Sequence, residues 1–259
     1  KINILIPMAG NGSRFQKKGY TLPKPMIDVA GKPIIQRMLE SLNIIGDYIF
    51  IVRKEHVERH NLDSLLKTLT PGCKILPIDM VTEGAACTTL LAKMLINNNI
   101  PLLIADCDLY IEWDSEKFLD LVSNMRKDAC VLTFTANNEG YSYVRTDETD
   151  TVVEAAEKKV ISTMATCGVH FWQRGEDYVK YAEQMIAKNI RTKNEFYVCP
   201  VYNEAILDNK KIAVFPVEKW LSLGTPEELE FFIKNKIDSR GEDGNVKKRL
   251  KKRARSIKK

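Results

Sequence analysis

Apolar and polar residues along the first half of the chain follow the pattern of strands joined by helices. Continuous apolar runs of strand length are typical of strands covered on both faces of a sheet. Between these runs, apolar residues recur at three- and four-residue spacings, as helices require. The predicted strands are 2–8, 47–52, 73–77 and 101–106, and the predicted helices are 33–45, 56–69 and 82–97. This order predicts βαβ units and a mainly parallel sheet flanked by helices.

The second half of the chain has a different pattern, in which short alternating runs follow one another closely. This spacing is typical of antiparallel strands. The predicted strands are 129–135, 141–145, 151–157, 166–172 and 212–216, and the predicted helices are 177–188, 195–207 and 226–235. The whole pattern indicates an α/β protein with a mixed sheet. At 259 residues, we expect one domain over 1–237 and a terminal segment over 238–259.

Charge is distributed unevenly between these two parts. The net charge of +5 conceals ten basic and three acidic residues in 238–259, against 29 basic and 31 acidic residues elsewhere. We therefore expect 238–259 to be a basic tail without fixed structure, or a linker, that contacts another domain or an anionic partner. The body of the protein is close to neutral and predicts no groove for nucleic acid.

Composition argues against several classes of protein. No window approaches the roughly 18 apolar residues of a membrane helix, and we expect no signal peptide before the first strand. The six cysteines are scattered without a CxxC pair, which predicts reduced thiols, a cytoplasmic location and no zinc site. The three histidines suggest no Ser/His/Asp arrangement, and His170 reads as a core or pocket-edge residue.

The first candidate for chemistry is the glycine-rich segment 10–14, Gly-Asn-Gly-Ser-Arg, which follows the first predicted strand. Glycines let backbone N–H groups approach a bound phosphate, and Arg14 adds a fixed positive charge. Lys24 lies between two prolines, which predicts an extended residue that reaches the same phosphates. The segment is neither a Walker A loop nor a dinucleotide fingerprint, because the glycine and lysine positions of those motifs are absent.

The second candidate is Asp106-Cys107-Asp108, which follows the apolar residues 101–105. Carboxylates at the carboxyl end of a parallel strand face the crevice in which open α/β sheets bind ligands. At least one of the two aspartates is therefore predicted to hold Mg²⁺ on triphosphate oxygens.

Three segments, 7–15, 22–26 and 31–34, together carry a family resemblance. Their sequences, Pro-Met-Ala-Gly-Asn-Gly-Ser-Arg-Phe, Leu-Pro-Lys-Pro-Met and Gly-Lys-Pro-Ile, resemble the signature of the sugar nucleotidyltransferases, the nucleoside-diphosphate-sugar pyrophosphorylases. The resemblance extends over roughly 1–236 and is greatest to a capsule-biosynthesis subgroup. It implies a GT-A-type, Rossmann-like fold and the transfer of a nucleotidyl group from a nucleoside triphosphate to a sugar 1-phosphate. Family members form dimers or tetramers, which implies a homo-oligomer here.

The resemblance also assigns roles on the nucleotide side. Arg14 and Lys24 would be catalytic, with Lys24 neutralising charge on the phosphate in the transition state, and Asp108 would hold Mg²⁺. Nucleotide binding would fall to the glycine loop, to a base-reading segment and to the first strand-end aspartate. These residues are Ala9, Gly10, Asn11, Gly12, Ser13, Glu83, Gly84, Ala85 and Asp106.

On the acceptor side, Glu157 and Lys158 resemble the Glu-Lys pair whose lysine holds the acceptor phosphate. Gly168 resembles the glycine of the strand beside the sugar, and Glu195 the acidic residue that contacts acceptor hydroxyls. Tyr141 and Tyr143, on a predicted strand, are further candidates for the acceptor site, with packing within the sheet as the alternative.

Two departures from the family pattern leave alternatives open. Ser222 replaces an aspartate that holds the metal in the family, so either Asp108 holds the metal with phosphates and waters, or another carboxylate such as Glu218 compensates. Lys159 replaces a proline beside the acceptor-binding lysine. A cytidylyltransferase acting on phosphocholine, glycerol phosphate or a similar phosphate therefore remains an alternative. So do a glycosyltransferase using 106–108 as an Asp-x-Asp motif and a non-catalytic nucleotide-binding protein.

Overall fold

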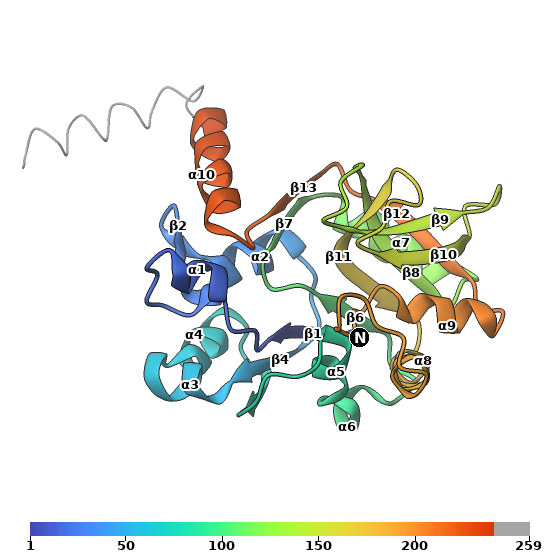
Figure 1. Cartoon of the computed structure of the whole chain (residues 1–259), viewed down its shortest axis with the longest axis horizontal. Coiled ribbons are helices and arrows are strands. Elements are labelled where there is room, and N and C mark those ends of the chain that lie inside the picture. The colour runs from blue at the N-terminus through green and yellow to red at the C-terminus, as the bar shows by residue number, and fades with distance from the viewer. Residues whose placement is uncertain (241–259) are drawn as a thin grey trace, which may run out of the picture.

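One nine-stranded mixed sheet runs through the molecule and joins the two halves of the predicted pattern (Figure 1). The computed structural model describes residues 1–240, so the expected basic tail lies outside the described residues from 241 onward. The parallel half of the sheet has the strand order β6 (Leu102–Ala105), β1 (Asn3–Met8), β4 (Asp47–Arg53) and β5 (Lys74–Ile78). This half confirms the predicted mainly parallel, Rossmann-like arrangement.

The second half of the sheet is built around the long strand β11 (Met164–Trp172), which lies antiparallel beside β6. Its other neighbours are β8 (Ala129–Thr135) and β9 (Ser142–Thr146), with β10 (Val152–Glu157) beyond β9 and β12 (Ile212–Pro216) parallel to β8. The direct pairing of β11 with β6 makes the two halves one continuous surface.

Alternate residues of the buried strands face two separate layers of helices. Leu5 and Ile104 pack toward α5 (Ala85–Leu90), α6 (Lys93–Ile96), α8 (Gly175–Ala187) and α9 (Val201–Leu207). Ile4 and Leu103 pack toward α2 (Ile34–Leu42), α3 (Lys54–His60), α4 (Leu62–Leu69) and α7 (Ser115–Asn124). This two-residue alternation is why the strands read as continuous apolar runs.

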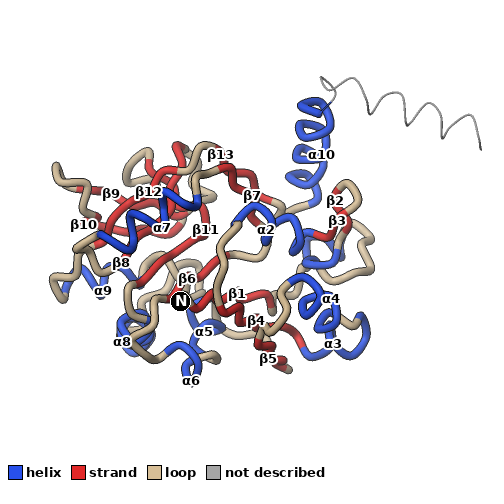
Figure 2. Tube along the Cα trace, turned by 180° about the vertical axis from the view of Figure 1, so that it is seen from behind, coloured by secondary structure: helices blue, strands red, loops and turns tan. Residues whose placement is uncertain are grey.

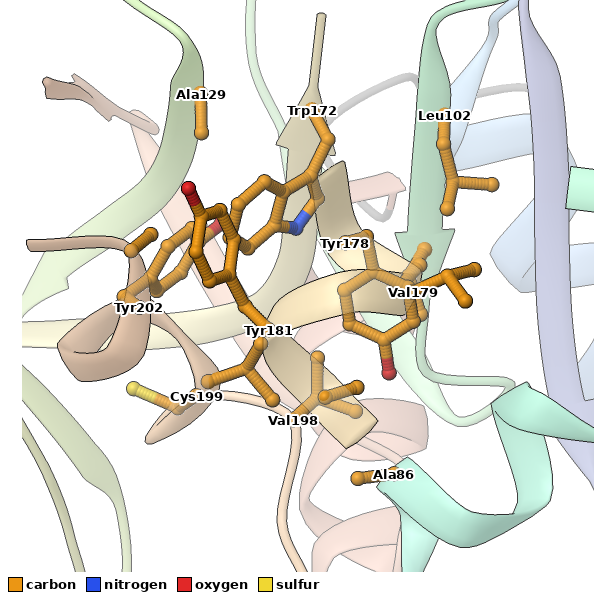
Figure 3. Close-up of a cluster of buried hydrophobic side chains, with 14 of the residues drawn as sticks. Ala86, Leu102, Ala129, Trp172, Tyr178, Val179, Tyr181, Val198, Cys199 and Tyr202 are labelled. Atoms are coloured by element: carbon orange, nitrogen blue, oxygen red, sulfur yellow. The ribbon is translucent and has the colours of Figure 1, made fainter. Parts of the chain in front are cut away.

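The first layer is centred on stacked aromatic rings (Figure 3). Trp172 at the end of β11 stacks on Tyr202 of α9, with ring centroids 5.0 Å apart. Tyr178 of α8 shares a 2.5 Å hydrogen bond with the Thr89 hydroxyl of α5. These contacts fix α5, α8 and α9 relative to the half of the sheet that is built around β11.

A third, smaller cluster attaches the C-terminal helix α10 (Pro226–Arg240) to the N-terminal elements. Leu229 and Phe232 of α10 pack with Phe15 of α1 (Ser13–Lys17). In Figure 2, α10 stands at one end of the molecule beside the short strands β2 (Asp28–Val29) and β3 (Lys32–Pro33). None of the described helices is long and apolar enough to span a membrane.

Several predicted helices are shorter or divided. The predicted helix 56–69 is two helices, α3 and α4, because Asn61 adopts a left-handed conformation with φ of 53°. The predicted helix 82–97 begins only at Ala85 and is likewise divided into α5 and α6. The prediction of a helix over 195–207 is wrong before Val201, because Glu195 bridges to Thr192 and the Phe196 backbone pairs with residues 83–86.

Three other local features differ from expectation. The sequence did not predict helix α7 or the two-stranded sheet of β7 (Leu109–Glu112) and β13 (Lys219–Ser222). The extended conformation predicted for Lys24 is wrong: Lys24–Met26 form a 3₁₀ turn. The Met26 N–H donates to the Pro23 carbonyl at 2.8 Å and closes this turn. Proline has no backbone N–H to donate, and its position in the first part of the turn does not require one.

Candidate active site

A cavity of about 520 Å³ opens at the carboxyl ends of β1 and β6. This is the edge of an open parallel sheet at which α/β proteins bind ligands. Most of the residues predicted for the nucleotide side line it together, although they come from segments far apart in the sequence. They are Ala9, Gly10, Asn11, Gly12, Ser13, Arg14, Lys24, Gly84, Ala85, Asp106 and Asp108.

The glycine-rich segment connects β1 directly to α1 and forms one wall of this cavity. Gly12 has φ of 61°, a left-handed conformation that glycine adopts without steric cost. A Cβ atom on Gly12 would lie 3.4 Å from the Cβ of Lys24. That distance is an ordinary van der Waals contact, so the left-handed backbone, and not crowding against Lys24, is what favours glycine at position 12.

Lys24 and Asp108 form an ion pair inside the cavity, with their side chains 21% and 23% exposed. Burial alone would lower the pKa of Lys24, but the charge of Asp108 and the hydrogen bond to it outweigh this and raise it to about 12. Lys24 is therefore a fixed cation at neutral pH, held on the carboxylate predicted to bind metal.

Asp106 points toward β11, where Gly168 makes room for it. A Cβ on Gly168 would lie 2.3 Å from Oδ2 of Asp106, and Gly168 has φ of 77°. Desolvation, and then the charge of Asp108, raise the pKa of Asp106 to about 7. The Asp106 side chain is nevertheless open to the cavity, so solvent there moderates this rise.

The segment predicted to read the base is held by the turn before α9. The Phe196 N–H donates to the Glu83 carbonyl at 2.9 Å, and the Ala86 N–H donates to the Phe196 carbonyl at 3.0 Å. A Cβ on Gly84, which has φ of 138°, would lie 2.3 Å from the Phe196 carbonyl oxygen. Only glycine fits at position 84 without displacing this backbone.

Glu83 itself does not line the cavity. Its carboxylate pairs with Arg191 at 2.5 Å and is 67% exposed. The guanidinium of Arg191 also lies over the Phe196 ring, 4.0 Å from its centroid. Glu83 therefore lies at the rim, where it holds the turn that closes against Gly84.

A second cavity of about 300 Å³ lies on the β9–β11 side. Three residues predicted for the acceptor line it: Glu157, Lys158 and Gly168. The Glu157 carboxylate accepts a hydrogen bond from the Ser142 hydroxyl, and Lys158 Nζ lies 3.7 Å from it. Burial raises the pKa of Glu157 against the lowering effect of these two partners.

The other two residues predicted for the acceptor are placed differently. Tyr143 is fully buried, and its hydroxyl donates to the Asn138 carbonyl at 2.7 Å, so it does not line the cavity. Tyr141, two residues earlier and before β9 begins, takes that place. Glu195 lines the first cavity, whereas its neighbour Tyr197 lines the second.

One wall of the second cavity is aromatic. Trp220 stacks on Phe134 with ring centroids 4.4 Å apart, and Tyr141 meets Trp220 edge-on at 5.1 Å. His170 also lines the cavity but is only 5% exposed, and this burial lowers its pKa to about 4. The sequence suggested His170 as a pocket-edge residue, and its position in β11 agrees with that.

The two cavities meet at a common set of residues. Arg14, Lys24, Asp106 and Asp108 line both of them, as do two small residues, Ala85 and Gly224. Two basic and two acidic side chains thus lie where the contents of one cavity would touch those of the other. This is the arrangement that a group transfer between two bound substrates requires.

The residues present at this junction fit Mg²⁺, which prefers carboxylate oxygens. Asp106 and Asp108 supply such oxygens, each beside a glycine whose Cβ would displace it, and the ammonium of Lys24 already lies on Asp108. Among residues 1–235, whose side chains the structure describes, no three His, Cys, Asp or Glu side chains lie close enough to hold a metal alone. Phosphate oxygens and water would therefore complete such a site, as is usual for Mg²⁺.

Sequence reasoning missed Glu228, in the first turn of α10, which lines the second cavity. The Ser222 hydroxyl donates to its carboxylate at 2.7 Å. Glu218, suggested from the sequence as a substitute carboxylate, is exposed and lines neither cavity. A signal for Glu228 was present: Thr225-Pro-Glu-Glu228 has the Ser/Thr-x-x-Glu pattern of a helix start, which places a glutamate near residues 222–224.

Comparison with known proteins agrees with this architecture. The bifunctional protein GlmU of Methanocaldococcus jannaschii is 29% identical over 157 residues, covering 61% of this chain and 36% of that protein. A nucleoside-diphosphate-sugar pyrophosphorylase from Vibrio cholerae RC9 is 23% identical with a TM-score of 0.74, over 89% of this chain and 99% of that one. UDP-glucose pyrophosphorylase, solved with UDP-glucose, is 18% identical with a TM-score of 0.74, over 92% and 99%.

At these identities the solved structures show the fold, which is the Rossmann-like α/β fold of nucleotide-sugar pyrophosphorylases. The family is shown by a separate match: the family described as nucleotidyl transferase matches residues 4–237. The chain therefore belongs to the nucleotidyl transferase family. It spans 36% of the length of the curated GlmU relative.

Proposed function

We propose that this protein transfers a nucleotidyl group from a nucleoside triphosphate to a phosphorylated acceptor, a sugar 1-phosphate, with release of pyrophosphate. The observation that carries this proposal is the junction of two cavities at Arg14, Lys24, Asp106 and Asp108. The triphosphate would occupy the cavity beside the glycine loop, and the acceptor would occupy the one beside Lys158. An oxygen of the acceptor phosphate would then attack the α-phosphorus at the junction.

The residues of this chain would act by positioning and by neutralising charge. Backbone N–H groups of the glycine loop and Arg14 would hold the triphosphate, and Lys24 would stabilise charge developing on the α-phosphoryl group. Lys158 would hold the acceptor phosphate, with its ammonium placed by Glu157 at 3.7 Å and by the Tyr197 ring at 5.3 Å. Asp108, with Asp106 nearby, would hold Mg²⁺, which when bound neutralises triphosphate oxygens.

Membership of the nucleotidyl transferase family favours this reaction over glycosyl transfer by 106–108. A second acceptor class remains open on a specific observation. Tyr141 and Trp220 present aromatic surfaces in a cavity that also contains the carboxylates of Glu157 and Glu228. Aromatic faces and carboxylates together suit an ammonium group, as in phosphocholine, as well as a sugar ring.

The test is a matrix of four nucleoside triphosphates against phosphorylated acceptors, scored by pyrophosphate release. The acceptors would include hexose 1-phosphates, phosphocholine and glycerol phosphate. Lys24→Ala should reduce turnover by about 100- to 1,000-fold, the usual loss for one preorganised charge contact. Lys17→Ala is the matched control, because Lys17 is exposed on α1 and lines neither cavity. Equal release by wild type and Lys24→Ala would refute the proposal.

The product would be an activated sugar for capsular polysaccharide, made in the cytoplasm by a homo-oligomer. The capsular role and the homo-oligomer rest on the family resemblance, and the cytoplasmic location rests on the scattered cysteines. Light scattering gives the oligomeric state, and loss of capsule on deletion of the gene tests the biological role. The segment 238–259 is proposed to be an appendage to a catalytic domain over 1–237, so its removal should leave turnover unchanged.

A further inference from the structure

We propose that Glu228 supplies a further protein carboxylate to the divalent-cation site at Asp108, in place of the aspartate that the family has at position 222. This inference rests on the proposed function, in which Asp108 holds the cation. It concerns a residue of α10 that no motif assigned to the site. Its support comes from three observations on Gly224, Ser222 and the first turn of α10.

The first observation is that three oxygen atoms converge on Gly224. A Cβ there would lie 2.7 Å from Oδ2 of Asp108, 3.1 Å from the Ser222 hydroxyl oxygen and 3.3 Å from Oε2 of Glu228. The carboxylates of Asp108 and Glu228 therefore both border the small space beside Gly224, which a larger residue would fill. Two oxygens that share one Mg²⁺ lie about 3–4 Å apart, because each Mg–O distance is about 2.1 Å.

The second observation is how Ser222 is used. Its hydroxyl donates to Oε2 of Glu228 at 2.7 Å, and the Gly224 N–H donates to the same oxygen at 3.1 Å. The residue that replaces the family aspartate is thus a donor that orients another carboxylate. An aspartate at 222 would instead bring a negative charge against Glu228.

The third observation is that Glu228 is held rigidly toward the site. The next residue, Leu229, is buried with Phe232 and Phe15, which ties the first turn of α10 to the glycine loop helix α1. Glu227, the preceding residue, points the other way and pairs with Lys18 at 3.0 Å on the surface. Glu228 lines the same cavity as Asp106 and Asp108.

A purely structural role for Glu228 is the competing explanation. Thr225 and Glu228 have capping-box spacing, and the Glu228 N–H donates to the Thr225 hydroxyl at 3.2 Å. In a capping box the glutamate returns to the N–H of the capping residue. Here its carboxylate accepts instead from the Gly224 N–H, one residue earlier, and from Ser222. The carboxylate is therefore turned from the helix end toward Asp108.

The experiment measures Mn²⁺ binding to the full chain in the presence of tripolyphosphate, with free Mn²⁺ followed by electron paramagnetic resonance. Glu228→Gln keeps the size of the side chain and an acceptor oxygen but removes the charge. We expect its Mn²⁺ affinity to fall at least tenfold, with the unfolding midpoint unchanged. Glu227→Gln is the matched control and should bind Mn²⁺ as the wild type does.

A rescue variant makes the result specific. Ser222→Asp in the Glu228→Gln background returns a carboxylate to the same wall, and we expect Mn²⁺ affinity to recover to within about threefold of wild type. Failure of this rescue would overturn the inference. Unchanged Mn²⁺ affinity in Glu228→Gln, with affinity lost in Asp108→Asn, would also overturn it while leaving the proposed function intact. Unchanged affinity in both variants would remove the cation from the proposed function as well.

Discussion

The buried His170 should make the stability of this protein depend on pH in a way that one substitution removes. His170 lies in β11 between strands β6 and β8, is 5% exposed, and its ring centroid is 5.6 Å from that of Tyr202. Its Nδ1 atom is buried, with no hydrogen-bond partner among the described residues. Burial lowers its pKa from 6.5 to about 4, so the folded state resists protonation there.

The sign and size of the effect follow from linkage. Above pH 6.5 the histidine is neutral in both states and adds no pH dependence. Below 6.5 the unfolded chain takes up a proton that the folded protein accepts only near pH 4. The loss of unfolding free energy is about 2 kcal/mol at pH 5 and about 3 kcal/mol at pH 4, because a tenfold difference in proton affinity between the two states corresponds to about 1.4 kcal/mol.

The assay compares urea unfolding of wild type and His170→Phe between pH 8 and pH 4. Phenylalanine keeps an aromatic ring beside Tyr202 but does not titrate. Asp106 and Glu157, whose pKa values are raised, change stability with the opposite sign, but they contribute equally to both proteins and cancel in the difference. The difference should be flat above pH 6.5 and should favour the variant increasingly below it. A difference that stays constant from pH 8 to pH 4 would refute the reasoning.

Three further substitutions test the geometry of the two cavities. Gly84→Ala should lower the unfolding free energy by about 2 kcal/mol and raise KM for the triphosphate, because the alanine Cβ would lie 2.3 Å from the Phe196 backbone. Unchanged unfolding free energy and unchanged KM would contradict this prediction. Gly168→Ala should lower kcat at least tenfold by displacing Asp106, and it should cost about 1–2 kcal/mol of stability through its φ of 77°. Lys158→Met should raise the acceptor KM about tenfold with the triphosphate KM unchanged, so an equal rise in both would count against its assigned role.

The elements that the sequence predicted well are those whose signal is local. Buried parallel strands such as 2–8 and 101–106 are continuous apolar runs, and the structure has strands at both. The glycine-rich segment and Asp106-Cys107-Asp108 could be placed together because both follow such strands. Their meeting at one cavity edge follows from parallel pairing of β1 with β6.

The features that the sequence could not predict depend on contacts between distant segments. A helix was predicted to begin at Glu195, yet Phe196 pairs with the backbone of 83–86, which withdraws it from a helix. The position of Glu228 also depends on a contact between distant segments. The pairing of β13 with β7 brings the first turn of α10 beside Asp108. The sequence could not distinguish Tyr141 from Tyr143 as acceptor-site residues. Tyr143 lies within β9 and is fully buried, whereas Tyr141 lies before β9 begins.

The ion pair between Lys24 and Asp108 has a consequence for ligand binding. In the protein without ligands, each of these groups satisfies the charge that the other would offer to a nucleotide or a cation. The first ligand to bind must separate the pair, and the second finds it already separated. Nucleotide and divalent cation are therefore expected to bind with positive cooperativity, each strengthening the other by the same factor, as thermodynamic reciprocity requires.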